Sequence, residues 1–163
     1  ASSAYGGVYH VVATNTAGSV PSRPATVVVR SVFATWGAGH GLDPDTTGQP
    51  DADPDGDGVG NAIEFLLGGV PVSAAHAPRP VFILAGDGSG LGEFVFARRC
   101  DHAEHFTLET QVSADLMSWI AAPGEGDGVT VEVSPVDSIM ERVTVRVPLG
   151  SPRVFVRLRA TTR

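Results

Sequence analysis

The feature that most constrains this chain is an aspartate-rich segment near its middle, residues 51–64, which reads DADPDGDGVGNAIE. Asp53, Asp55 and Asp57 stand at alternate positions, and Gly58 follows them with the backbone freedom that a sharp turn requires. A curled loop of this kind brings three carboxylates around one point, where they repel one another unless a cation lies between them. The segment therefore predicts a loop folded around a metal ion.

The residues after the three aspartates complete a set of oxygen ligands. In this arrangement the Val59 carbonyl faces the ion, Asn61 reaches it directly or through water, and Glu64 closes it with both carboxylate oxygens. Acidic residues at the first, third, fifth and twelfth places are the spacing of an EF-hand loop. Because every ligand is a hard oxygen, we expect Ca2+ rather than zinc, and a flexible seven-coordinate cage suits Ca2+ better than Mg2+. The alternative interpretation is an acidic, solvated turn.

Three further aspartates precede the loop, Asp43, Asp45 and Asp51. Residues 46–50 break their spacing, so the sequence leaves open whether they bind a second calcium or add one ligand. These three and the loop place seven of the 18 acidic residues between positions 43 and 64. The net charge of −7 is therefore concentrated locally, and it opposes nucleic-acid binding, which requires a basic face.

Short helices are expected on both sides of the loop. Residues 31–38 can form the first, with Ser31 as its N-cap, and residues 61–67 the second. Glycines are expected to end both helices, namely Gly37, Gly39 and Gly41 for the first and Gly68 and Gly69 for the second. We therefore assign residues 31–77 to a calcium-binding helix–loop–helix linker.

Residues 1–30 predict a β-hairpin, with strands over residues 8–13 and 25–30 and a turn at residues 15–18. The run GVYHVVATNTAGSV resembles the last two strands of an immunoglobulin-like domain, in which a tyrosine, here Tyr9, opens the penultimate strand. Tyr5 departs from the acidic residue usual in that family, and the earlier strands are missing. Because two strands alone are marginally stable, we expect the hairpin to dock either on the C-terminal strands or on a neighbouring subunit. We prefer the second, because a chain that begins so late in a domain looks processed.

Residues 78–163 alternate between apolar and polar side chains with a period of two, which is typical of half-buried antiparallel strands. About seven strands are expected, over residues 81–85, 93–98, 106–112, 119–121, 129–133, 142–147 and 153–160. Turn signals separate them, and such a run favours a C-terminal antiparallel β-sandwich. The predicted fold class is mainly β, in three parts: residues 1–30, 31–77 and 78–163.

The middle of the chain also carries a wider resemblance. The block ADPDGDGVGN, residues 52–61, running into EFLLG, residues 64–68, resembles the thrombospondin type 3-like and dockerin-like calcium segments of large exported bacterial proteins of Verrucomicrobia and Planctomycetes type. In those exported proteins, an immunoglobulin-like array precedes the calcium loop and a β-rich terminal domain follows it. The resemblance implies a structural, calcium-stiffened junction without catalytic chemistry. A dockerin carries two such loops and this chain has one clear copy, so cohesin docking is disfavoured.

Other residues leave two alternatives open. The single cysteine, Cys100, excludes an internal disulfide, and with His102, His105 and Asp101 it could bind zinc or copper. Aromatic side chains could stack on sugars, namely Tyr5, Tyr9, Trp36 and Trp119. The sequence shows no nucleophile beside a base and an orienting group, so we expect no enzymatic centre.

These observations predict a non-catalytic, calcium-stabilised structural or adhesion module of a secreted or cell-surface protein. Its expected partners are further copies of the chain, as a homo-oligomer or filament, or another cell-surface protein. The alternative function is a carbohydrate- or ligand-binding module. No apolar stretch approaches the roughly 18 residues that a membrane-spanning helix needs.

Overall fold

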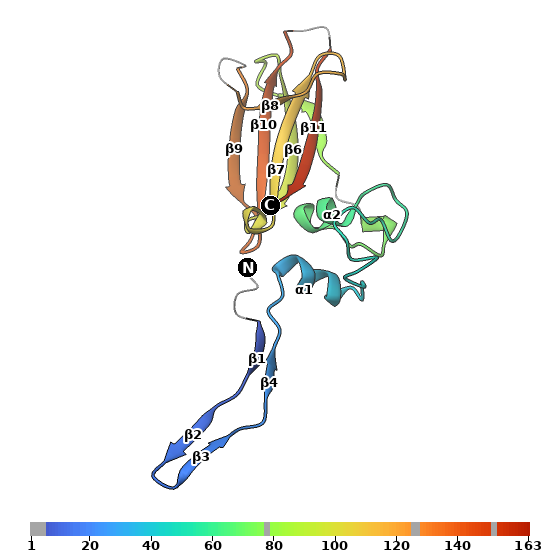
Figure 1. Cartoon of the computed structure of the whole chain (residues 1–163). Helices are drawn as coiled ribbons and strands as arrows, with labels where there is room; N and C mark the ends of the chain where they lie inside the picture. Colours follow the sequence, from blue (N-terminus) through green and yellow to red (C-terminus); the bar gives the residue numbers. More distant parts are fainter. Residues whose placement is uncertain (1–5, 77–78, 125–127, 151–152) are drawn as a thin grey trace.

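A computed structural model describes residues 6–76, 79–124, 128–150 and 153–163 (Figure 1). The described chain is mainly β, with several antiparallel sheets and two α-helices, which confirms the predicted fold class at this level. Two sheets lie at one end of the molecule, the helices lie beside them, and a narrow two-stranded ribbon extends away at the other end.

The C-terminal half folds into a four-stranded and a three-stranded antiparallel sheet. The order in the first is β5-β6-β10-β9, with β5 at Val81–Leu84, β6 at Leu91–Arg99, β10 at Met140–Pro148 and β9 at Thr130–Pro135. The order in the second is β11-β7-β8, with β11 at Phe155–Thr162, β7 at Phe106–Ser113 and β8 at Ile120–Ala122.

The main hydrophobic core lies between these two sheets. From Val143 onward, alternate residues of β10 are buried, namely Val143, Val145 and Val147, and Phe94 and Phe96 of β6 are buried beside them. Partly buried residues of the other sheet pack against this cluster, among them Leu108, Val112, Val156 and Leu158. Because full burial of a valine or phenylalanine contributes about 1.5–3 kcal/mol, this alternation stabilises the pair of sheets.

Several strands begin and end away from the predicted positions. The strand expected at residues 119–121 is β8 at Ile120–Ala122, because the Trp119 indole N–H donates to the Leu116 carbonyl at 3.2 Å and holds Trp119 in the preceding turn. The strand expected at residues 129–133 is β9, shifted to Thr130–Pro135 by its register against β10. Hydrogen-bonding partners that are remote in sequence set these ends.

Helix α1 spans Val32–Gly39 and helix α2 spans Asn61–Leu67. Ser31 caps α1, since its hydroxyl accepts from the Ala34 N–H at 3.0 Å. The prediction that Gly37 ends α1 is wrong: Gly37 is a buried residue inside the helix, where it lies against Leu42. Gly68 ends α2 with a φ of 81°, a left-handed conformation that favours glycine. Short 3-10 helices occur at η2, Ala74–His76, and η3, His102–Glu104.

A second hydrophobic cluster joins both helices to the end of β7. Phe65 and Leu66 of α2 and Phe106 of β7 are buried, and Phe33 and Trp36 of α1 pack on them. The ring centroids of Phe33 and Phe65 are 5.3 Å apart, and those of Phe33 and Phe106 are 5.2 Å apart, both edge to face. The backbone N–H of Val32 also donates to His105 Nε2 at 3.2 Å. This cluster holds both helices beside the sheets, and with α2 the C-terminal end of the aspartate-rich loop.

The N-terminal ribbon contains two separate ladders. In one, β1 (Gly7–Tyr9) pairs with β4 (Ala25–Val27), and in the other, β2 (Val12–Asn15) pairs with β3 (Gly18–Pro21). The continuous strand predicted over residues 8–13 is therefore wrong, because the pairing stops near Pro21 and Pro24, which lack an N–H. Val11 and Ser22 bridge the gap instead: Ser22 N–H donates to the Val11 carbonyl at 2.7 Å.

All four ribbon strands are exposed along their whole length. The apolar side chains of the ribbon therefore lie in solvent, and Val8, Val11 and Val20 are about 70% exposed, at 67%, 72% and 70%. Figure 1 shows the ribbon pointing away from the two sheets. Tyr5, part of the immunoglobulin-like resemblance, lies outside the described residues.

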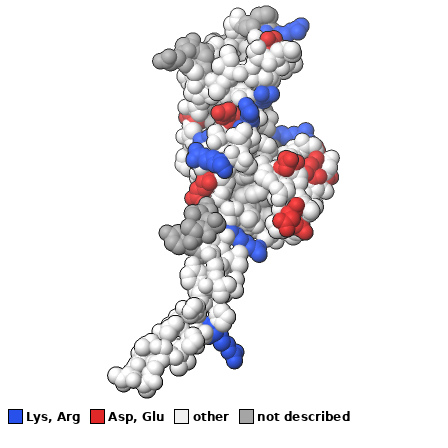
Figure 2. Space-filling model, viewed as in Figure 1, with Lys and Arg blue, Asp and Glu red and all other residues white. Residues whose placement is uncertain are grey.

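Charge is distributed unevenly over the body of the molecule. Figure 2 shows acidic side chains gathered over the lobe that contains α2 and the loop before it. None of the helices in the described ranges is long and apolar enough to cross a membrane.

Candidate metal centre

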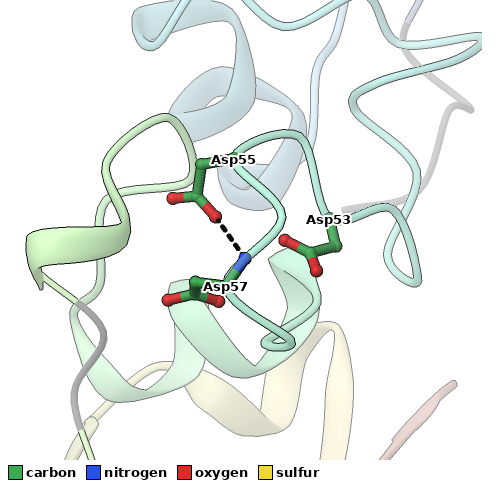
Figure 3. A group of neighbouring side chains, drawn as sticks. All are labelled: Asp53, Asp55 and Asp57. Atoms are coloured by element: carbon green, nitrogen blue, oxygen red, sulfur yellow. Dashed lines mark hydrogen bonds between the residues drawn. The ribbon is translucent and has the colours of Figure 1, made fainter.

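Three carboxylates converge in the loop before α2. Asp53, Asp55 and Asp57 each place one oxygen so that the three atoms lie within 4.8 Å of one another (Figure 3). Asp55 and Asp57 are half-buried, whereas Asp53 is exposed. Like charges at this separation repel strongly at partial burial, so the arrangement favours a cation among them.

Hydrogen bonds within the loop fix the curl of its backbone. Asp53 accepts from Gly56 N–H and Gly58 N–H, both at 2.9 Å, one through each carboxylate oxygen. Asp55 Oδ1 accepts from Asp57 N–H at 3.2 Å, and Asp57 Oδ1 accepts from Val59 N–H at 2.7 Å. Gly56 and Gly58 have φ values of 74° and 88°, so the turn depends on glycine at both positions.

These bonds use only one oxygen of Asp55 and one of Asp57. The second oxygen of each, Oδ2, is buried and has no hydrogen-bond partner among the described residues. A buried carboxylate oxygen without a donor costs free energy comparable to a lost hydrogen bond to a charged group. Two such atoms in one loop favour a positively charged partner there.

Glu64 adds the third and fourth oxygens of this kind. It lies one turn into α2, is 0% exposed, and neither of its carboxylate oxygens has a hydrogen-bond partner in the described part of the chain. Burial, and after it the negative charges of Asp55, Asp57 and Asp53, together raise its pKa from 4.5 to about 7. The same three aspartates therefore act on a glutamate that the core holds in place through its neighbour Phe65.

Asn61 supplies a fifth buried oxygen. It is the first residue of α2 and is 0% exposed. Its amide Nδ2 donates to the Thr47 carbonyl at 2.7 Å and to the Gln49 carbonyl at 2.8 Å, while Oδ1 has no described partner. Residues three positions apart share a helix face, so the Asn61 and Glu64 side chains leave α2 on the same side.

This donor set fits a hard divalent cation. All five unpartnered buried atoms are carboxylate or amide oxygens, and they come from four of the six residues that the sequence predicts as ligands. Thiol and imidazole groups, which zinc prefers, are not among them. Val59, whose carbonyl the sequence assigns to the ion, is half-buried and is anchored through its N–H.

The upstream aspartates stand apart from this group. Asp43, Asp45 and Asp51 are exposed, and Asp45 N–H donates to Asp43 Oδ1 at 2.8 Å. Within the described residues, the one set of three acidic, histidine or cysteine ligands close enough to share an ion is Asp53, Asp55 and Asp57.

The Cys100 segment uses its polar groups locally. Arg99 donates to both oxygens of Asp101, at 2.8 and 2.9 Å, and this hydrogen bonding lowers the pKa of Asp101. His102 Nδ1 lies 2.9 Å from the Arg99 carbonyl, and His105 Nε2 accepts from Val32 N–H. Cys100 itself is exposed. The structure therefore places these residues in separate contacts rather than around one ion.

The aromatic residues considered for sugar stacking are dispersed. Trp36 packs on Phe33 and Phe65 with centroids 5.6 and 5.5 Å apart. Arg157 covers the Trp119 ring at 4.0 Å, and Tyr9 lies on β1 in the ribbon.

Sequence reasoning missed one part of this centre, the carbonyls of Thr47 and Gln49 that hold the Asn61 amide. Backbone carbonyls carry no signal in a one-letter sequence. The one sequence signal near these carbonyls is Gly48, which lies between Thr47 and Gln49. A larger residue does not fit there, because its Cβ would lie 2.8 Å from the Asp43 carbonyl oxygen.

The chain matches no protein-family model, no curated protein and no solved structure in the comparisons with known proteins.

Proposed function

We propose that this chain is a non-catalytic structural module whose central loop binds Ca2+. The observation that carries the proposal is the Glu64 carboxylate, which is 0% exposed and has two unpartnered oxygens beside Asp53, Asp55 and Asp57. A buried carboxylate is stable as an ion only when it is paired with positive charge. The chain offers no cationic side chain to Glu64 in its described hydrogen bonds or ion pairs, so an external cation takes that role.

The proposed ligands are the oxygens of six residues: Asp53, Asp55, Asp57, the Val59 carbonyl, Asn61 and Glu64. Their hard-oxygen chemistry and the curled, glycine-containing loop favour Ca2+ over Mg2+, which demands near-ideal octahedral geometry. The role is structural because the ligands join a loop to α2, whose Phe65 and Leu66 belong to the core.

This function comes with a three-part organisation. Residues 1–30 form an immunoglobulin-like terminal hairpin, residues 31–77 a helix–loop–helix linker around the ion, and residues 78–163 a β-sandwich domain. The core between the two C-terminal sheets supports the last of these parts and the exposed ribbon strands support the first, while α1 and α2 pack both on each other and on Phe106 of β7.

We place the module in a secreted or cell-surface protein, where calcium is abundant, and propose that it associates with further copies of itself through the ribbon. The exposed valines of β1 to β3 support self-association, since apolar strands with free edges favour pairing with another chain. The alternative, a carbohydrate-binding module, has less support, because the described tryptophans pack against other side chains.

Calcium titration of Glu64→Gln tests the assignment of the ligands. Glutamine keeps the size of the side chain and removes its charge, so we expect calcium affinity to fall by at least about tenfold, or ~1.4 kcal/mol. Asp87→Asn is the matched control, because Asp87 is an exposed acid in the turn between β5 and β6. Equal affinities for the wild type and Glu64→Gln would exclude this site.

A further inference from the structure

The buried amide of Asn61 lies between two parts of the molecule. Its Nδ2 group donates to the carbonyls of Thr47 and Gln49, at 2.7 and 2.8 Å, in the segment of residues 42–50 that we call the upstream loop. Its Oδ1 is buried and has no partner among the described residues. Because both acceptors are carbonyls, the NH2 group of the amide must face the upstream loop. The Oδ1 atom then faces away from that loop, and we assign it to the proposed ion.

The upstream loop in turn contacts α1. Leu42 N–H donates to the Gly37 carbonyl at 3.0 Å, and Leu42 is buried against Gly37. Phe33, Gly37, Leu42 and Gln49 also line one hollow with Arg30, the last residue before the Ser31 cap. A continuous set of contacts therefore runs from Asn61 through the upstream loop to the start of the ribbon.

The upstream loop is held in one tight conformation. Gly48 N–H donates to the Asp43 carbonyl at 2.6 Å, Thr46 N–H donates to the same carbonyl at 3.2 Å, and Gln49 N–H donates to the Thr46 carbonyl at 3.2 Å. Asp43 N–H also donates to Thr47 Oγ1 at 3.0 Å, so these bonds all lie within one turn of the upstream loop. From outside, the upstream loop is held by the bond of Leu42 to Gly37, by the Asn61 amide, and by Ala62 N–H, which donates to the Pro50 carbonyl at 2.8 Å.

We propose that Asn61 couples occupancy of the metal site to the order of the upstream loop, and through that loop to the attachment of α1 and the ribbon. This inference rests on the proposed function, because it requires an ion on the Oδ1 side of the amide. A cation on Oδ1 polarises the amide and strengthens donation from Nδ2 to the two carbonyls. It also fixes the Asn61 side chain, so calcium tightens the contacts of the upstream loop, which contains none of the proposed ligands.

The test is amide hydrogen exchange by NMR on the full chain, with calcium and with a chelator. We expect calcium to slow exchange at Thr46, Gly48 and Gln49 by at least about tenfold, together with exchange of the Asn61 side-chain amide. In Asn61→Asp the oxygen toward the ion remains, and the hydrogens given to Thr47 and Gln49 are lost. With each protein saturated by calcium according to its own titration, the variant should show no slowing at the three backbone amides. Thr46→Ala, an exposed neighbour, is the matched control and should respond at Gly48 and Gln49 like the wild type.

The outcomes separate this inference from the proposed function. A wild type that binds no calcium refutes both. A wild type that binds calcium without slowed exchange in the upstream loop, or an Asn61→Asp variant that binds calcium and is protected equally, overturns the coupling and leaves the metal site standing. If Asn61→Asp does not fold, the wild type decides: the Asn61 side-chain amide and the loop amides must become protected over the same range of calcium concentration.

Discussion

At the scale of single residues, Glu64 is the group of the proposed metal centre whose pKa is raised. It is buried and has no hydrogen-bond donor in the described part of the chain, and burial followed by the charges of Asp55, Asp57 and Asp53 raises its pKa to about 7. In the unfolded chain the same carboxyl has its ordinary pKa near 4.5. The metal-free folded state therefore binds a proton between these two values that the unfolded state does not bind.

From this difference we predict that metal-free protein loses stability as the pH rises from about 4.5 to about 7. The folded state holds more protons in this window, so the free energy of unfolding decreases with increasing pH and levels off above it. The decrease in the free energy of unfolding that comes from Glu64 is on the order of 3 kcal/mol. Urea unfolding in chelator at a series of pH values measures it.

Glu64→Gln supplies the control for this experiment, because it carries no titratable proton. The decrease between pH 4.5 and 7 should shrink in this variant, since the remaining dependence comes from other groups. A wild type and a variant with parallel pH profiles would contradict the assignment of the raised pKa to Glu64.

The same pKa predicts that calcium affinity depends on pH. Calcium displaces the proton from Glu64, so affinity should be nearly constant above about pH 7.5 and fall by up to about tenfold per pH unit below pH 7. Isothermal titration calorimetry in buffers of different ionisation enthalpy would detect the released proton. Affinity that is unchanged between pH 6 and 8 would argue against Glu64 as a ligand.

Among the secondary-structure elements, helix α2 has the central place. Its N-terminal residue Asn61 and the next-turn residue Glu64 belong to the candidate centre, and Phe65 and Leu66 belong to the core. Phe65 packs against Trp36 and Phe106, with Arg99 over its ring at 4.6 Å. The helix is only seven residues long, so tertiary contacts rather than helix propensity keep it folded.

We predict that Phe65→Ala lowers the free energy of unfolding by about 3–5 kcal/mol, because Phe65 is 1% exposed and its removal leaves a cavity. Val20→Ala, at an exposed ribbon position, should change it by less than about 0.5 kcal/mol. Urea denaturation of both variants in calcium provides the comparison. A loss below about 1 kcal/mol for Phe65→Ala would show that α2 does not depend on this cluster.

Sequence periodicity was sufficient for the C-terminal strands and insufficient for the ribbon. Valines at positions 143, 145 and 147 predict a half-buried strand, and all three are buried in β10. The apolar residues near Val11 follow a similar pattern and are exposed, because burial depends on a facing surface that local sequence does not encode. For the metal centre, the spacing from Asp53 to Glu64 predicts the three converging aspartates, whereas the contact of Asn61 with Thr47 and Gln49 depends on the path of the upstream loop.

At the scale of the whole molecule, the ribbon and the body differ in both charge and packing. The described ribbon, residues 6–30, contains Arg23 and Arg30 and no acidic residue, whereas the acidic residues gather on the body. No described residue outside the ribbon buries its valines. Exposed apolar strands with free edges favour association with another chain.

We therefore predict that the intact chain self-associates in solution through the ribbon. Deleting residues 1–30 should give a soluble monomer that retains calcium binding, and Val11→Lys in the intact chain should weaken association, because lysine on an exposed edge disfavours strand pairing. Sedimentation velocity over a range of concentrations measures the effect. A monomeric intact chain at high concentration would contradict self-association and leave the metal site unaffected.

The most direct test of the central claim is thermal unfolding of the wild-type chain in calcium and in chelator. Extracellular sites of this class have dissociation constants of about 10⁻⁴–10⁻³ M, and free calcium at tenfold that constant stabilises the folded state by about 1.4 kcal/mol. For a chain of this size we expect the melting temperature to rise by about 3–6 °C, and we expect Asp53→Ala to abolish the rise. Superimposable melting curves for the wild type in calcium and in chelator would contradict the claim that this loop is a calcium site.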